Sequence, residues 1–145
     1  MTEQMEIQFE ENFLYRNNRN ITTRYDIALT ELIANAWDAG ATKVSITIPH
    51  NYHESLIIED NGTGMTLEEL KQRWLTLGYN RIKHQGIDVV FPDDIKDKKR
   101  IAYGHNGSGR HSMFCFNNIY QLETWKDNQY TKCDVIMSDG DSAFK

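Results

Sequence analysis

The sequence is poor in cysteine and has no long apolar run. Its two cysteines, Cys115 and Cys133, show no CxxC spacing and no neighbouring cluster of metal ligands, so we expect buried free thiols rather than a zinc site. No apolar segment approaches the ~20 residues of a membrane-spanning helix. The opening residues, MTEQMEIQFE, are acidic and lack the basic and apolar segments of a secretory signal. We therefore expect a cytoplasmic location.

An excess of basic residues is also missing. The 145 residues include 16 Lys and Arg against 21 Asp and Glu, a formal net charge of -5, and no basic block dominates. Such a domain attracts nucleic acid weakly, so we expect no direct binding to nucleic acid or to a membrane. Hydrophobic residues make up 39% and charged residues 26%, which is typical of a soluble globular protein. The length suits a single domain over residues 1–145.

A helix is predicted over residues 24–39. Thr23 and Asp26 have the spacing of a capping box, and Gly40 can end the helix. At about 100° per residue, three polar residues fall on one stripe and four apolar residues take the opposite side. The polar stripe consists of Glu31, Asn35 and Asp38, and the apolar side of Leu29, Leu32, Ile33 and Ala36. The apolar side explains why a helix forms, whereas the polar stripe needs another explanation.

Alternating apolar residues and turn residues predict the strands, over residues 44–48, 55–60, 119–125 and 130–137, with an opening strand within 1–21. Thr66 and Glu69 form a second capping box before a helix over 66–77, and a short helix is expected within 110–118. A turn around Asp127 and Asn128 joins the last two strands into an antiparallel hairpin. The order of elements predicts a two-layer α/β (α+β) sandwich with a mixed, mostly antiparallel sheet and helices on one face.

Residues 78–103 break the periodic pattern with Gly, Pro and charged residues. A loop of this length in a compact domain is usually a functional lid or disordered, so we expect a lid over about 78–103. For the preceding segment RWLTLGYNRIK, the simpler alternative is a helix end followed by a basic loop. Another strand would be natural after SDGD, near the end of the sequence, and we expect the chain to be truncated at its C-terminus.

Three polar or glycine-rich segments stand out: ELIANAWDAGAT, DNGTGM and GHNGSGR. Taken singly, they fit a solvated helix face, a tight turn and a flexible loop. These interpretations do not explain why all three occur together at the ends of predicted helices and strands. Other motifs fit poorly, because the sequence has no GxxxxGK[ST] loop, no GxGxxG spacing, no EF-hand pattern of oxygens and no recognisable catalytic triad.

Together the three segments resemble the motifs of the GHKL ATPase superfamily, which includes DNA gyrase B, MutL, MORC proteins, heat-shock chaperones and histidine kinases. ELIANAWDAGAT is similar to the N box, ExxxNxxDA; DNGTGM resembles the DxGxG box; and GHNGSG resembles the second glycine box, GxxGxG. The match covers residues 31–109. DAGAT and RWLTLGYNRIK favour the MutL- and MORC-like branch, and Glu31 argues against a histidine kinase, which generally lacks a carboxylate base there.

The resemblance implies a Bergerat-type ATP-binding fold with ATP and Mg²⁺ bound. Asp60 would accept a hydrogen bond from the adenine amino group, because an ionised carboxylate can only accept. Glu31 would act as general base, Asn35 would offer a neutral oxygen to Mg²⁺, and Asp38 would support the site through a polar network. The other residues expected to bind the nucleotide are Gly62, Gly64, Met65, Gly104, Asn106, Gly107, Ser108, Gly109 and Arg110.

The activity implied by the resemblance is slow Mg-dependent ATP hydrolysis. Nucleotide binding would close the lid and favour a homodimer, which would control a partner domain C-terminal to this chain. Many relatives also use a catalytic lysine from a second domain, which we do not find in this sequence. The alternative is a nucleotide-gated binding or assembly domain with negligible hydrolysis, and a third possibility is a degenerate relative with a structural role only.

Overall fold

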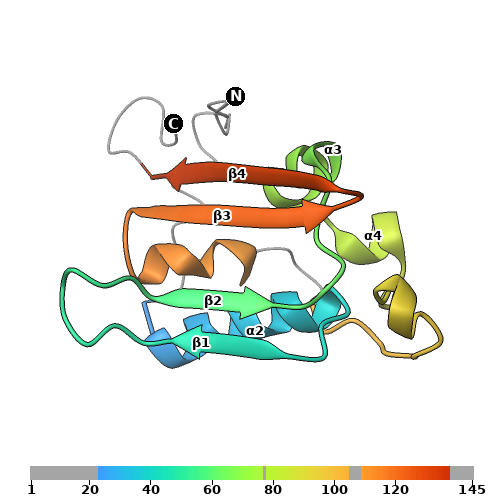
Figure 1. Ribbon diagram of the computed structural model, residues 1–145, viewed down its shortest axis with the longest axis horizontal. Coiled ribbons are helices and arrows are strands. Elements are labelled where there is room, and N and C mark those ends of the chain that lie inside the picture. Colours follow the sequence, from blue (N-terminus) through green and yellow to red (C-terminus); the bar gives the residue numbers. More distant parts are fainter. Residues whose placement is uncertain (1–22, 77, 105–108, 138–145) are drawn as a thin grey trace.

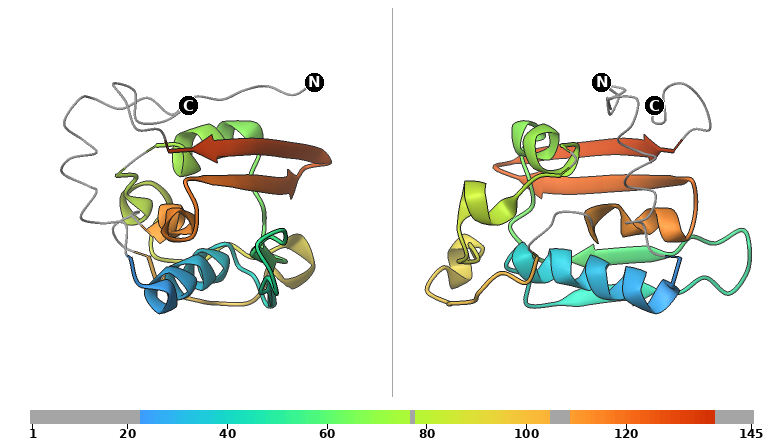
Figure 2. Two further views of the ribbon diagram at one scale, coloured as in Figure 1. Left: turned by 90° about the vertical axis from the view of Figure 1, so that its left-hand side faces the viewer. Right: turned by 180° about the vertical axis from the view of Figure 1, so that it is seen from behind.

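The protein is built from two antiparallel β-hairpins and a layer of helices behind them (Figure 1). The computed structural model describes residues 23–76, 78–104 and 109–137. Figure 2 shows the longest helix and the helical segment that precedes β3 on the same side of the hairpins. This arrangement confirms the predicted α/β fold class with antiparallel strands and helices on one face. The predicted opening strand within residues 1–21 lies outside the described residues.

The strands pair only within each hairpin among the described residues. β1 (Val44–Thr47) pairs with β2 (Ile57–Asp60), and β3 (Ile119–Lys126) pairs with β4 (Gln129–Ile136), both antiparallel. The sharp β3–β4 turn places Asp127 and Asn128 at φ angles of 51° and 59°, the backbone that two-residue hairpin turns with Asp and Asn adopt. The four predicted strands and this turn are therefore confirmed.

Helix α2 (Tyr25–Asp38) lies behind β1 and β2 and carries the polar stripe. Gly40 ends it as predicted, at a φ of 74°, with its N–H donated to the carbonyl of Trp37. The predicted capping box was wrong, because the guanidinium of Arg24 binds the Asp26 carboxylate at 2.6 Å and the Arg24 N-cap receives no side-chain cap. The predicted apolar side was only partly correct. The buried residues of α2 are Ala28, Leu32 and Ala36, while Ile33 is 42% exposed.

The predicted helix over 66–77 begins as expected but changes its winding. Thr66 and Glu69 form the capping box at the start of α3 (Leu67–Glu69), which continues directly into the π-helical turn η1 (Leu70–Trp74). Leu70, at the junction, has no exposed surface and belongs to the core with Phe114, Tyr120 and Val135. Hydrophobic spacing does not distinguish an α-helix from a π-helical turn, so the sequence could not predict this change.

The segment expected to be an irregular loop over 78–103 has structure of its own. It contains α4 (Arg81–Gln85), the 3₁₀ turn η2 (Asp93–Ile95) and an isolated β-bridge between Asp88 and Ile101. Val89, Phe91 and Ala102 form a small buried cluster with Ile95 packed against it. The segment therefore packs against α2 and has a small buried core, so it is not an irregular loop.

The short helix predicted within 110–118 is the 3₁₀ helix η3 (Gly109–Cys115), which packs against α2. Both cysteines are free as expected, but only Cys133 is buried, whereas Cys115 is partly exposed. Burial raises the pKa of the Cys133 thiol to about 11. Among the described residues, no helix is long and apolar enough to cross a membrane.

Candidate functional site

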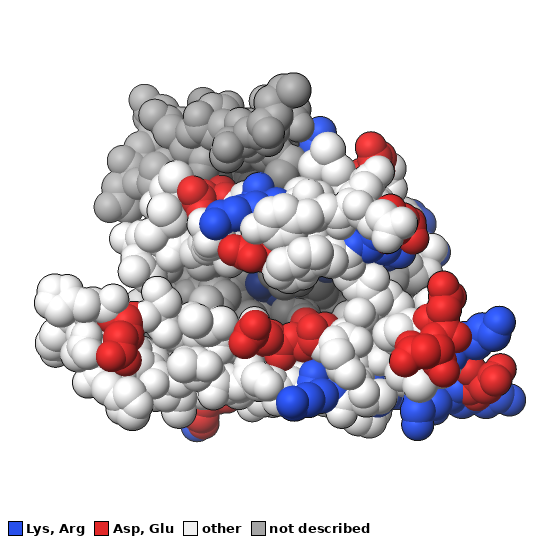
Figure 3. Space-filling view, viewed as in Figure 1, with Lys and Arg blue, Asp and Glu red and all other residues white. Residues whose placement is uncertain are grey.

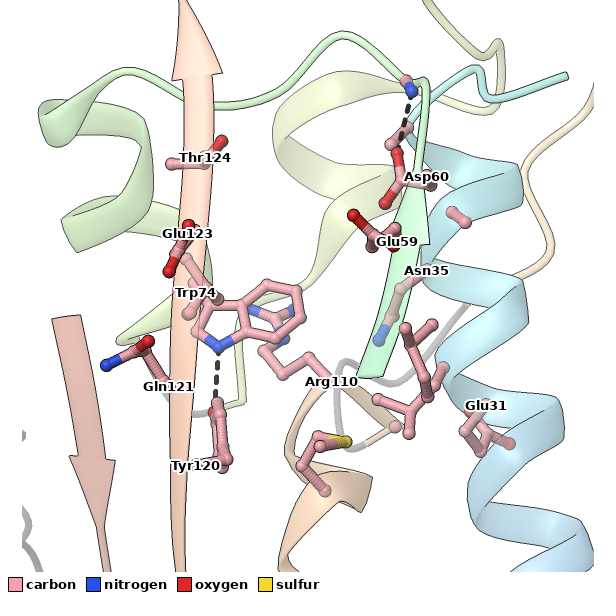
Figure 4. A pocket seen from close by; sticks show the side chains of 18 of the residues that line it. Glu31, Asn35, Glu59, Asp60, Trp74, Arg110, Tyr120, Gln121, Glu123 and Thr124 are labelled. Atoms are coloured by element: carbon pink, nitrogen blue, oxygen red, sulfur yellow. Dashed lines mark hydrogen bonds between the residues drawn. The ribbon is translucent and has the colours of Figure 1, made fainter. Parts of the chain in front are cut away.

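A large open cavity lies between the two hairpins. It is lined by α2, β2, η3 and β3, and its volume of about 2360 Å³ exceeds the ~300–1,000 Å³ of an ordinary ligand pocket. Figure 3 shows the hollow from the front, with acidic side chains along its rim. Glu31 and Asn35 of α2, Asp60 of β2 and Arg110 of η3 all line this one cavity (Figure 4). The structure therefore brings residues from all three sequence motifs to a common space.

Glu31 lies directly against the last glycine of the GHNGSG segment. A Cβ atom on Gly109 would overlap the Glu31 carboxylate, so a side chain at position 109 would displace the end of the Glu31 side chain. Glu31 is partly buried, and η3 begins at Gly109. The candidate general base thus sits where the second glycine segment meets α2.

Asn35, one helical turn further on, has an unsatisfied polar atom. Its side chain points into the cavity (Figure 4), and its amide nitrogen is buried with no hydrogen-bond partner among the described residues. Turning the amide by half a rotation would present its oxygen at the same place. A buried amide normally has a partner, so a ligand that supplies one fits this position.

A magnesium ion fits this site only as a nucleotide-bound ion. Within the described part of the chain, no group of three or more His, Cys, Asp or Glu side chains could hold a metal. Mg²⁺ in nucleotide sites usually has one or two protein ligands and takes its other ligands from phosphates and water. The Asn35 amide is a suitable single donor for such an ion.

Asp38 holds the beginning of the second glycine segment. Its carboxylate accepts hydrogen bonds from the backbone N–H groups of Tyr103, at 2.7 Å, and Gly104, at 2.9 Å. Each carboxylate oxygen accepts one of these bonds, so the contacts of Asp38 are with the backbone that enters the glycine segment. The expected phosphate-binding residues Asn106, Gly107 and Ser108 lie outside the described residues.

Asp60 is the last residue of β2, and only one of its two carboxylate oxygens accepts a hydrogen bond from the described residues. Its Oδ1 accepts a hydrogen bond from the N–H of Gly62 at 2.8 Å, and no donor among the described residues reaches Oδ2. The side chain projects toward the cavity from the strand end (Figure 4). The bond to Gly62 fixes the orientation of the carboxylate, which leaves Oδ2 able to accept a hydrogen bond from a ligand.

The glycines of DNGTGM are required by neighbouring backbone. A Cβ on Gly62 would lie 2.6 Å from the carbonyl oxygen of Ala39, and a Cβ on Gly64 would overlap the carbonyl oxygen of Trp125. Gly64 also has a φ of 64°, which strains any residue with a side chain. The segment therefore sits tightly between the end of α2 and β3, and Met65 donates its N–H to Thr124 Oγ1 at 2.8 Å.

Arg110 is a buried charge without a carboxylate partner. It is 9% exposed, and none of the ion pairs in the described part of the chain includes it. Its guanidinium lies 5.2 Å from the centre of the Tyr79 ring and donates a 3.4 Å hydrogen bond to the Tyr79 carbonyl. Burial lowers the pKa of Arg110.

Behind Arg110, three side chains form a hydrogen-bonded chain that sequence reasoning did not identify. Trp74 Nε1 donates to the Tyr120 hydroxyl at 3.0 Å (Figure 4), and the hydroxyl lies 3.0 Å from His111 Nδ1. The indole can only donate, so the Tyr120 hydroxyl accepts from Trp74, and the direction of its contact with His111 Nδ1 depends on the tautomer of the neutral imidazole. Burial and the charge of Arg110 lower the pKa of His111 to about 4, which keeps the ring neutral.

Other cavity residues missed at the sequence level come from β3. Gln121, Glu123 and Thr124 line the cavity from this strand. The only sequence signal of Gln121 and Glu123 is the polar half of the alternation in IYQLETW, which is equally typical of an ordinary exposed strand face. Thr124 falls on the buried half of the same alternation, where a threonine gives no signal of a site. Their proximity to the α2 motif depends on the tertiary fold and could not be read from spacing.

Comparison with known families decides what kind of site this is. The family model of histidine kinase-, DNA gyrase B- and HSP90-like ATPases matches residues 22–142. The chain belongs to this ATPase family. Membership supports ATP binding by the chain and confirms the resemblance to the GHKL superfamily.

Relatives of this ATPase chain include larger proteins. It is 29% identical over 122 residues to a Herpetosiphon aurantiacus protein named "Putative type II restriction enzyme HgiDII", covering 84% of the chain and 18% of that protein. It is 28% identical over 111 residues to the DNA mismatch repair protein MutL of Opitutus terrae, covering 76% and 16%. The chain thus spans less than a fifth of either relative. No solved structure matches it significantly.

The buried neutral His111 predicts a loss of stability in acid. Its pKa in the folded chain, about 4, lies below the ordinary value of 6.5, so the unfolded chain binds the proton more tightly between these values. This contribution is complete above pH 6.5 and is lost as the pH falls toward 4, amounting to about 3 kcal/mol at 1.36 kcal/mol per pKa unit.

Urea denaturation of the unaltered chain and of His111→Gln, at pH 7 and pH 4.5, measures this loss. We expect His111→Gln to show a smaller difference in unfolding free energy between the two pH values, because glutamine does not titrate. The exposed His53→Gln serves as the matched control. Equal pH dependence in all three proteins contradicts the assignment.

Proposed function

We propose that the chain binds ATP with Mg²⁺ in the cavity between the hairpins and hydrolyses it slowly. The observation that carries the proposal is that Glu31, Asn35, Asp60 and Arg110, from separate segments, line one cavity. Counting only partners in the described part of the chain, an unsatisfied amide, a carboxylate oxygen without a donor and a buried cation without a carboxylate lie in the same space. A nucleotide supplies a partner for each of these groups.

Adenine would bind at the β2 end of the cavity. Asp60 Oδ2 would accept a hydrogen bond from the adenine 6-amino group, while Oδ1 keeps its bond to Gly62. Guanine has a carbonyl oxygen at the corresponding position, which a carboxylate repels. Gly62, Gly64 and Met65, held between α2 and β3, would form the wall beside the base.

The triphosphate would lie toward η3 and the second glycine segment. Gly104, Asn106, Gly107, Ser108 and Gly109 would present backbone N–H groups to it, as a glycine-rich loop can. Arg110 would place its charge beside the phosphates, which would compensate the cost of burying the guanidinium. Asn35 would hold Mg²⁺, which when bound neutralises phosphate charge.

Hydrolysis requires a water molecule aligned with the γ-phosphate. Glu31 would accept one proton from this water while the water oxygen forms a bond to the γ-phosphorus. The bond between that phosphorus and the β–γ bridging oxygen breaks, the electron pair stays with ADP, and inorganic phosphate leaves. Contact with Gly109 would fix the Glu31 carboxylate in place for this step.

Residues 78–103 would act as a lid, and nucleotide binding would favour a homodimer that controls a further domain of the protein. The lid role is supported by cavity-lining residues in and just before α4, namely Tyr79, Arg81, His84 and Gln85. The names of the larger relatives, a restriction enzyme and a mismatch repair protein, support a role in DNA processing for the protein that carries this module. A role in DNA would fall to other domains, since this one is acidic.

Replacing the proposed base separates hydrolysis from binding. We expect Glu31→Ala to keep ATP affinity and to lose about 10²- to 10⁴-fold in turnover, the usual contribution of general base catalysis. Phosphate release and calorimetry measure the two quantities, and exposed Glu68→Ala is the control. Unchanged turnover would refute the role of Glu31. ATP binding by the unaltered chain without measurable turnover would select the nucleotide-gated binding domain instead.

Replacing Asp60 tests the adenine end of the site. Asp60→Asn keeps an oxygen for the Gly62 N–H but replaces the second acceptor with a donor, so we expect ATP affinity to fall by at least about tenfold, within the ~1.5–3 kcal/mol of a hydrogen bond to a charged group. Calorimetry with ATP measures the loss, and Asp127→Asn in the exposed β3–β4 turn is the control. Retained affinity in Asp60→Asn counts against this pocket.

A further inference from the structure

Arg100 connects the segment before the second glycine box to the end of α2. Its Nη1 atom donates hydrogen bonds to the carbonyl oxygens of Trp37, at 3.0 Å, and Ala41, at 2.8 Å. The guanidinium also lies over the Trp37 ring, 4.0 Å from its centre, and 4.9 Å from the centre of the Phe91 ring. Arg100 therefore combines two carbonyl contacts with two aromatic contacts.

The end of α2 receives cations from other segments, Arg100 and also Arg81, whose Nη2 donates to the Asp38 carbonyl at 3.5 Å. The last turn of α2 contains no basic residue, although its terminal carbonyl groups carry partial negative charge. Arg100 supplies the positive charge from 63 residues away along the chain. The contact is reciprocal, because Trp37 Nε1 donates a 2.9 Å hydrogen bond to the carbonyl of Ile101.

These contacts lead directly into the nucleotide site. Tyr103 and Gly104 follow Ile101, and their N–H groups bind the Asp38 carboxylate. Gly109, at the other end of the glycine segment, contacts Glu31. α2 thus touches the glycine segment at both of its described ends, about 10 Å apart along the helix at 1.5 Å per residue.

We propose that Arg100 is a positioning residue that holds Tyr103 and Gly104 on Asp38 and thereby sets the phosphate-binding side of the nucleotide site. The role rests on the proposed ATP binding. Arg100 is not among the residues that line the cavity. Its effect on affinity is therefore transmitted through the backbone of Gly104.

Positioning differs measurably from a general contribution to stability. Loss of Arg100 would release the end of the glycine segment that contacts phosphates, but would leave Asp60 and the adenine side unchanged. ATP affinity would then fall while adenosine affinity is retained. A residue that only stabilises the fold would change the affinity for both ligands equally or for neither.

The test uses two variants. Arg100→Met keeps an unbranched aliphatic stem but removes the charge, and Arg100→Lys keeps the charge but removes the planar guanidinium. Lys71→Met removes the same charge from an exposed residue outside the cavity lining and the proposed lid, and is the matched control. Backbone hydrogen exchange at Tyr103 and Gly104 reports the attachment to Asp38. Calorimetry with ATP plus Mg²⁺ and with adenosine reports the two halves of the site.

For Arg100→Met we expect faster exchange at Tyr103 and Gly104 and at least a tenfold loss of ATP affinity, about 1.4 kcal/mol. The affinity for adenosine should stay within about twofold of its value in the unaltered chain. Arg100→Lys should fall between Arg100→Met and Lys71→Met, and it carries the test if Arg100→Met does not fold.

Two results overturn the proposal. Exchange at Tyr103 and Gly104 that matches the Lys71→Met control shows that Arg100 does not hold these residues. Equal losses of ATP and adenosine affinity, or no loss of either, show that it does not position the phosphate side. If the unaltered chain binds neither ligand, the proposed ATP binding fails, and the exchange measurement still decides whether Arg100 holds Tyr103 and Gly104.

Discussion

The architecture of the site depends on two hydrogen bonds from the backbone of Tyr103 and Gly104 to the carboxylate of Asp38. They join the end of α2 to a segment about 65 residues later in the chain. A carboxylate that accepts two neighbouring N–H groups fixes the backbone direction as well as its position, and bonds to an ionised group are stronger than neutral ones. Because Glu31 and Asn35 lie on the same helix, this one attachment relates the second glycine segment to the candidate base and the candidate magnesium ligand.

The glycines of the site follow from how closely its segments pack. Gly62, Gly64 and Gly109 each face a neighbour that a Cβ atom would overlap, namely Ala39, Trp125 and Glu31. The same lack of side chains that brings α2, β2 and β3 together also leaves backbone exposed for a ligand. Close packing and ligand binding therefore both favour a residue without a side chain at these positions. The interpretation of these glycines as simple turn residues explains only part of their role.

Local interactions were predicted well from the sequence, and distant ones were not. The Thr66–Glu69 capping box, Gly40 as a helix end and the Asp127–Asn128 turn depend on residues a few positions apart. The capping box at Thr23 failed because Arg24, the adjacent residue, binds Asp26 instead. The motifs predicted that Glu31, Asn35 and Asp60 share a site, and these residues do line one cavity. Arg100 and Thr124 gave no signal, because their partners lie about 60 residues away in sequence.

The central claim is that these segments form one site selective for an adenine nucleotide. Calorimetric titration of the unaltered chain with ATP and with GTP, both in the presence of Mg²⁺, tests it most directly. The account predicts one ATP site per chain and markedly weaker binding of GTP, because the Asp60 carboxylate matches an amino group and repels a carbonyl oxygen. No binding of ATP, or equal affinity for the two nucleotides, would contradict it.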